Sequence, residues 1–173
     1  MKSIINGRMR AMNTVDILRN QLLSELEIGI RSMEGLLGKV QVKDWEYQPA
    51  DNMRSLKDLA KHIVSIPEVD LHIFQGKDGD TVKKIEEKYD RLESAEEMIN
   101  AMHHGFKAYK TYILSLSEED LLLKKTTPFY LEEGEIQAHW FVEEVSHLFH
   151  HRGQFFNYLK QLGYDVTMFD LYV

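Results

Sequence analysis

Residues 146–154 read SHLFHHRGQ, and the three histidines in this stretch raise the question of a metal site. Because each residue of an α-helix turns by about 100°, His147 and His151 lie within about 40° of each other on one helical face. Two ligands of a single ion must share a face in this way. His150 lies about 100° from His151 around the same axis and is expected to point elsewhere.

The stretch belongs to a long amphipathic segment, which we predict as a helix from Glu135 to about Leu162, ended by Gly163. Three more segments nearer the N-terminus repeat apolar residues at steps of three and four, the spacing of one helical face. They cover residues 13–37, 55–74 and 94–116.

Capping residues support these boundaries. Asn13 stands before the first segment and Ser55 before the second, and both residue types favour the start of a helix. Ser94 and Glu97 have the spacing of a capping box, which predicts the start of the third helix. Pro67 lies inside the second segment, where we expect it to kink or interrupt the helix.

The connections between these segments are more polar. Residues 80–93 are predicted as a connection that contains one helical turn, and residues 124–133 as a loop or short strand. Four long amphipathic segments without a run of alternating strands predict an all-α fold, a four-helix bundle.

Composition limits the classes of protein that this chain can represent. Its 173 residues suit one domain, which we place at residues 13–173 after an N-terminal lead-in at residues 1–12. The net charge of −7 argues against binding nucleic acid, and no apolar run has the length of a membrane span. The chain has no cysteine, which fits the reducing cytoplasm and leaves histidine and carboxylate as metal ligands.

Two histidines make a weak site, so a third ligand is expected from another helix. His62 is the best candidate, because it lies among apolar residues on the inward face of the second helix. Spacing alone leaves a second interpretation open. A chain with eight histidines contains such a pair by chance fairly often, and a histidine on an apolar face is commonly a core residue.

Glu143 lies one turn before His147, and His139 one turn before Glu143. We predict Glu143 as a catalytic residue, acting as a base or a fourth ligand. The alternative is a hydrogen bond from Glu143 to the second nitrogen of a ligand imidazole. Its neighbour Glu144 is interpreted as a solvated helix residue. The role of His139 stays open.

Three segments together resemble the DinB/YfiT-like family of bacterial metal-binding bundles. The first is a tryptophan-proline loop at residues 45–49, followed by residues 55–63, which contain His62. The second is the H-x-x-x-H-R-G-Q pattern of residues 147–154, and the third is the helix exit at residues 158–164. The resemblance implies a four-helix bundle with up-down-down-up connectivity that is often a homodimer. It also implies that His62, His147 and His151 bind a divalent ion, commonly zinc or nickel.

Some members of the family that this chain resembles are transferases that use a low-molecular-weight thiol, such as bacillithiol, mycothiol or glutathione. Another member is a mycothiol-dependent isomerase. Three imidazole ligands leave an ion its charge and an open position, and such an ion lowers the pKa of a bound thiol or water. We therefore expect a thiol S-transferase whose small-molecule substrate is unknown. The alternatives are a metal-water hydrolase and a non-catalytic metal-binding dimer.

The predicted homodimer has a second motivation in the first and third long segments. Both carry apolar residues beyond their main stripe, and a monomer rarely leaves large apolar patches exposed. These residues are Leu23, Leu36, Ile99 and Tyr112.

Overall fold

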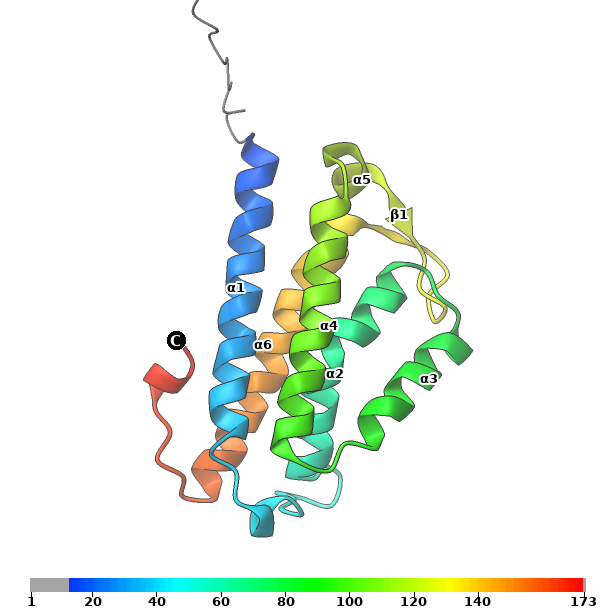
Figure 1. Ribbon diagram of the computed structural model, residues 1–173. Coiled ribbons are helices and arrows are strands. Elements are labelled where there is room, and N and C mark those ends of the chain that lie inside the picture. Colours follow the sequence, from blue (N-terminus) through cyan, green and yellow to red (C-terminus); the bar gives the residue numbers. More distant parts are fainter. Residues whose placement is uncertain (1–12, 173) are drawn as a thin grey trace, which may run out of the picture.

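The structure, a computed structural model, describes residues 13–172 (Figure 1). The lead-in predicted for residues 1–12 therefore lies outside the described residues. The described chain is helical apart from two short strands and its loops. Its α-helices are α1 (Thr14–Leu37), α2 (Leu56–Phe74), α3 (Gly79–Asp90), α4 (Ala95–Ser115), α5 (Glu118–Leu123) and α6 (Gln137–Gln161), and its 3-10 helices are η1 (Val42–Asp44) and η2 (Met168–Asp170).

The predicted caps of the first three long helices are confirmed. The side chains of Asn13 and Ser55 accept hydrogen bonds from backbone N–H groups of α1 and α2. Ser94 and Glu97 form the capping box of α4, which satisfies two backbone donors at once. Pro67 does not end α2, because the helix continues through it to Phe74.

Helix α6 begins two residues later than predicted. Glu135 and Ile136 form strand β2 (Glu135–Ile136), which pairs antiparallel with β1 (Lys125–Thr126). The short extended strand predicted within residues 124–133 is therefore present.

The four long helices pack around one apolar core. Helix α2 contacts α4 and α6, and α1 contacts the same two helices. Each long helix buries apolar side chains, among them Leu26, Ile63, Tyr109 and Phe155. An all-α fold is confirmed, while the up-down-down-up order of the helices stays a prediction.

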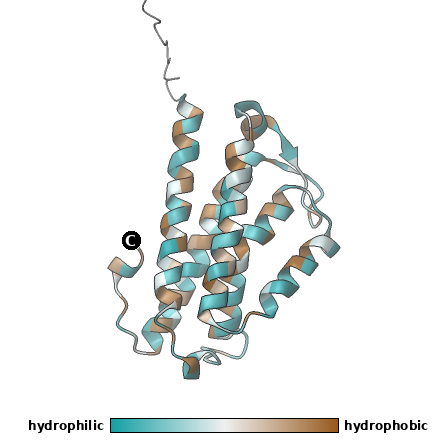
Figure 2. Cartoon of the chain, viewed as in Figure 1, coloured by the Kyte–Doolittle hydropathy of each residue, from teal (hydrophilic) through white to brown (hydrophobic). Residues whose placement is uncertain are grey.

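The prediction for residues 80–93 was wrong, because a full helix, α3, covers Gly79–Asp90. Figure 2 shows α3 mostly in the hydrophilic colour, which explains why its pattern was missed. Only Val82, Ile85 and Tyr89 are buried, at helical steps of three and four. Asp78 caps the helix by accepting a hydrogen bond from the N–H of Thr81. Helix α3 packs against α2, the helix that carries His62.

Two of the residues proposed for a dimer surface lie instead in the core. Leu23 is 4% exposed and Leu36 is fully buried, whereas Ile99 and Tyr112 are half-buried. None of the helices within residues 13–172 combines the length and the apolar character needed to cross a membrane.

Candidate metal centre

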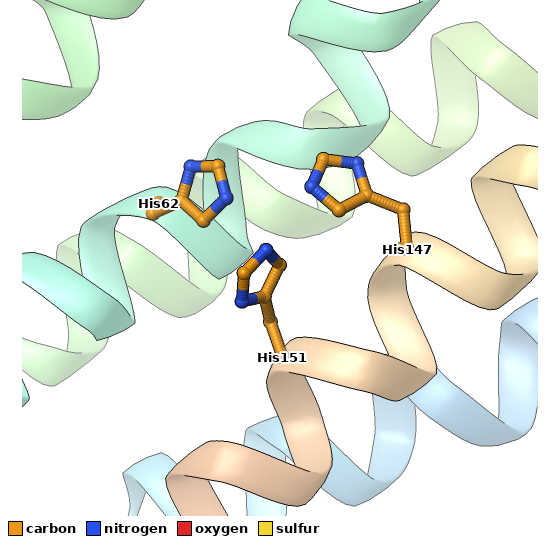
Figure 3. A group of neighbouring side chains, drawn as sticks. All are labelled: His62, His147 and His151. Atoms are coloured by element: carbon orange, nitrogen blue, oxygen red, sulfur yellow. The ribbon is translucent and has the colours of Figure 1, made fainter.

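The three histidines predicted as ligands point toward one another between α2 and α6 (Figure 3). The ring centroids of His62 and His151 are 4.5 Å apart, those of His147 and His151 are 4.9 Å apart, and those of His62 and His147 are 5.3 Å apart. One nitrogen from each ring lies within 4.8 Å of the others. Three imidazole nitrogens at this separation can hold one metal ion.

Helix packing brings the cluster together. His62 is flanked on α2 by the buried residues Leu59 and Ile63, which fix that face of the helix against its neighbours. On α6, the buried residue Leu148 lies next to His147 and packs into the core. All three imidazoles are themselves half-buried, so they are held by the bundle and still reachable from outside.

Asp70 orients the ring of His147. Its Oδ2 lies 2.8 Å from Nδ1 of His147, and a carboxylate can only accept, so the Nδ1–H group is the donor. The proton on Nδ1 leaves Nε2 with a free electron pair directed at the cluster. A carboxylate bonded to a ligand imidazole in this way is common at metal sites.

Gln154 has the same role at His151. Its amide oxygen Oε1 lies 2.7 Å from Nδ1 of His151 and accepts a hydrogen bond from the Nδ1–H group, so Nε2 is again the free nitrogen. The amide nitrogen of Gln154 lies 3.2 Å from Nε2 of His150, which is exposed and outside the cluster. His150 therefore points elsewhere, as predicted.

The electrostatics of the cluster favour neutral rings at two of the three positions. Burial lowers the pKa of His62 to about 3, and the charges of Arg54 and of the other two histidines add to that effect. Burial also lowers the pKa of His151, with further lowering by the charge of His147. At His147 the hydrogen bond and charge of Asp70 outweigh burial and raise the pKa. A metal ion needs the neutral form of each ring, which the lowered pKa values of His62 and His151 favour. At His147 a bound ion would replace the proton on Nε2, while Asp70 keeps the proton on Nδ1.

Glu144 is not a solvated helix residue, which corrects the sequence interpretation. It is fully buried, and among the described residues neither of its oxygens accepts a hydrogen bond. Burial raises its pKa well above the ordinary value, and the charge of Asp70 raises it further. Once protonated, Glu144 can donate to the carboxylate of Asp70, and Asp70 accepts from His147. These three residues form a chain that runs from the core to the cluster.

Glu143 lies outside the group of three histidines. Its Oε2 is 3.6 Å from Nε2 of His139, one turn away on the same helix, and both side chains are substantially exposed. Its charge contributes to the raised pKa of His147, after the contributions of Asp70. The alternative for Glu143 was to accept a hydrogen bond from the second nitrogen of one of these imidazoles. Asp70 accepts that hydrogen bond at His147, and Gln154 accepts it at His151.

The sequence carried weak signals for these supporting residues. Gln154 lies seven residues after His147, so it shares the face of the ligand pair. Asp70 is a charged residue between the apolar residues Val69 and Leu71 of a helix that is otherwise mostly apolar there. A charge in such a position needs a partner, which is the physical signal for a buried hydrogen bond.

Comparison with solved structures shows the same fold in bacterial proteins. A protein from Exiguobacterium sibiricum assigned to the DinB family is 24% identical, with a TM-score of 0.75, over 90% of this chain and 97% of that chain. A DinB-like protein from Bacillus cereus is 20% identical, with a TM-score of 0.68, over 86% of this chain and 95% of that one. A DinB-like protein from Bacillus subtilis is 19% identical, with a TM-score of 0.62, over 84% and 93%.

Comparison with curated proteins gives no match. The sequence profile of the DinB family, however, matches residues 12–173 and so includes both helices that carry the histidine cluster. Because that match covers nearly the whole sequence, this chain belongs to the DinB family.

Proposed function

We propose that this DinB family protein binds a divalent ion, zinc or nickel, and acts as a metal-dependent transferase of a low-molecular-weight thiol. The observation that carries the proposal is the convergence of His62, His147 and His151, with one nitrogen of each ring within 4.8 Å of the others. Hydrogen bonds from Nδ1 of His147 and of His151 direct the remaining nitrogens inward.

The ligand set suits a catalytic ion better than a structural one. Structural zinc sites are closed by four protein ligands, whereas three imidazoles leave a position for a small molecule. When bound, the ion would lower the pKa of a coordinated thiol and so supply the nucleophile. The chain has no cysteine, so the thiol would come from a cosubstrate.

We assign Glu143 the role of base in this reaction. Its carboxylate lies one turn from His147 and is exposed enough to exchange a proton with solvent. It would accept the proton that the thiol loses on entering the site. Glu143→Gln keeps the shape of the side chain but cannot take up a proton. The variant should keep its metal and lose about 100-fold in rate, since general-base terms are about 10²–10⁴.

The proposal is tested by metal analysis followed by a thiol-transfer screen on purified protein. One equivalent of zinc or nickel is expected, with turnover that a chelator removes and added metal restores. His62→Ala should lose both metal and turnover. His103→Ala is the matched control, because His103 is an exposed histidine on α4 bonded to Glu34. Stoichiometric metal without turnover on any thiol or ester would instead indicate a non-catalytic metal-binding protein. Turnover of esters alone would indicate a hydrolase.

We also propose that the protein is a homodimer. The support lies in large apolar side chains that remain exposed on two helices in contact with each other. Ile17 and Leu18 on α1 are 45% and 60% exposed, and Leu114 on α4 is 50% exposed. Light scattering at micromolar concentration should give twice the mass of one chain, and Leu18→Glu should shift it toward one chain. A mass of one chain for the unchanged protein would refute the dimer.

A further inference from the structure

A cavity of about 450 Å³ lies directly beside the histidine cluster. His62 is the one histidine of the cluster that lines it, so a molecule in the cavity contacts the cluster through His62. One wall comes from the start of α2 and includes Arg54 and Lys61. The opposite wall comes from α3 and includes Glu86 and Asp90. The α2 side therefore carries two cations and the carboxylate of Asp58, and the α3 side carries carboxylates alone.

Of the two cations on this wall, Arg54 is the one that forms no ion pair with a described residue. It is exposed, and among the described residues no carboxylate lies within 4.0 Å of its guanidinium. Lys61, by contrast, donates to the backbone oxygen of Asp90 at 2.5 Å and lies 3.7 Å from Glu93. A negatively charged group of a ligand can therefore bind the guanidinium of Arg54, whereas the ammonium of Lys61 already has partners.

The backbone around Arg54 is held in place. Its carbonyl oxygen accepts a hydrogen bond from the buried Tyr158 side chain at 3.2 Å, which ties the segment to α6. Arg54 also lines a second cavity of about 320 Å³, together with Gln154. Gln154 is the residue that orients His151, so Arg54 shares one cavity with His62 and another with the residue behind His151. Consistent with this position, its charge lowers the pKa of both His62 and His151.

A guanidinium binds a carboxylate through two parallel N–H···O hydrogen bonds, which gives both affinity and orientation. We propose that Arg54 binds a carboxylate group of the thiol cosubstrate and that the protein selects carboxylate-bearing thiols. This inference rests on the proposed thiol chemistry. Asp58, Glu86 and Asp90 also line the cavity and repel a carboxylate, so the unpaired guanidinium of Arg54 is the group in this cavity that a carboxylate can bind.

The test uses a binding signal that does not depend on turnover. Cobalt(II) is loaded in place of the native ion, and thiols are titrated while the thiolate-to-cobalt absorption is recorded. The probes are 4-mercaptobutyrate and 4-mercaptobutan-1-ol, which differ in the charged group and share the chain length. The six-carbon pair, 6-mercaptohexanoate and 6-mercaptohexan-1-ol, repeats the comparison with a longer reach.

The unchanged protein should bind the carboxylate thiol of at least one pair about 10- to 100-fold more tightly than the alcohol. Arg54→Gln should abolish this preference and leave the affinity for the alcohol unchanged. Arg54→Lys should keep only part of the preference, because an ammonium lacks the planar fork. Lys57→Gln is the matched control: it removes one nearby positive charge, but Lys57 already pairs with Glu93 and should leave the preference intact.

The outcomes separate the two proposals. Equal binding of acid and alcohol thiols by the unchanged protein overturns the role of Arg54 and leaves the thiol chemistry standing. A preference that survives in Arg54→Gln also overturns it, because the carboxylate would then be bound elsewhere. A cobalt-loaded protein that gives no thiolate absorption with any probe overturns the thiol chemistry, and the inference with it.

Discussion

His147 and His151 lie one turn apart on α6 and face the same point, yet their surroundings differ. The Nδ1 of His147 bonds to Asp70, which is only 6% exposed, and behind Asp70 lies the fully buried Glu144. The Nδ1 of His151 bonds to Gln154, which is half-buried and shares its amide with the exposed His150. The ring of His147 is supported from the core and that of His151 from the surface.

The difference shows what each side of the site can tolerate. A buried carboxyl pair is costly unless it is hydrogen-bonded, so Asp70 and Glu144 depend on each other and on His147. A half-buried amide has water as an alternative partner, and the loss of its hydrogen bond costs less. Substitutions on the core side should therefore have larger effects than matching ones on the surface side.

The largest effect is expected for Asp70→Asn. The amide of Asn carries no charge, so its oxygen is a weaker acceptor for the Nδ1–H of His147, and its NH2 group cannot accept at all. Metal affinity should fall about 10- to 100-fold, the usual loss for such a supporting residue. Competition with a chromophoric chelator measures it. Glu68→Gln is the control on the same helix, because Glu68 bonds to Lys88 and Tyr89 instead. An Asp70→Asn affinity within about twofold of the unchanged protein contradicts the core-side support.

The next effect concerns stability and pH, through Glu144. Because its pKa is raised well above 4.5, folded Glu144 keeps its proton at pH values where the unfolded chain has lost it. Folding then takes up a proton, so the free energy of unfolding falls as pH rises from 4.5 toward the raised pKa. The slope for one proton is at most about 1.4 kcal/mol per pH unit.

Glu144→Gln has no proton to take up at this position. Its free energy of unfolding, minus that of the unchanged protein, should therefore increase with pH above 4.5. Urea unfolding of metal-free protein at several pH values measures the difference. Glu143→Gln corrects for the loss of one charge at the neighbouring position. A difference that stays constant over the pH series would show that Glu144 is not protonated in the folded state.

The four long helices and the pairing of His147 with His151 on one face were predictable because periodic apolar residues and a fixed i, i+4 spacing depend on local geometry alone. Residues on different helices, such as His62 and His147, could be paired only by assuming a bundle and by the resemblance to the DinB/YfiT-like family. Helix α3 was missed because its single buried stripe is short and its other faces are polar. Polar composition indicates a loop when a helix has so little to bury.

The supporting residues were harder to predict, since their roles depend on which groups meet in three dimensions. Glu143 and Glu144 are adjacent and chemically identical, but one is exposed enough to pair with His139 and the other is fully buried beside Asp70. A rotation of about 100° separates these environments. The sequence interpretation placed Glu143 near the ion and Glu144 in solvent, and only the packing of α6 against α2 shows that Glu144 is the buried one.

A smaller effect on metal affinity is expected for Gln154→Ala, which removes the surface-side support. Water can replace the amide oxygen at Nδ1 of His151, so affinity should fall about 2- to 10-fold. The same chelator competition measures it. A loss as large as that of Asp70→Asn would mean that the two sides of the site do not differ in the way proposed.

The smallest effect is expected for His150→Ala, and it determines where the surface-side network ends. His150 is exposed, and its Nε2 accepts from the amide nitrogen of Gln154 at 3.2 Å, a long hydrogen bond that water can replace. Metal affinity should therefore stay within about twofold of the unchanged protein, both alone and in the Gln154→Ala background. If His150→Ala alone matched the loss of Gln154→Ala, the hydrogen bond to His150 would be what holds the Gln154 amide in position. Gln154 and His150 would then form a coupled network behind His151, as Asp70 and Glu144 do behind His147. The two histidines would differ only in how deeply their supporting residues are buried.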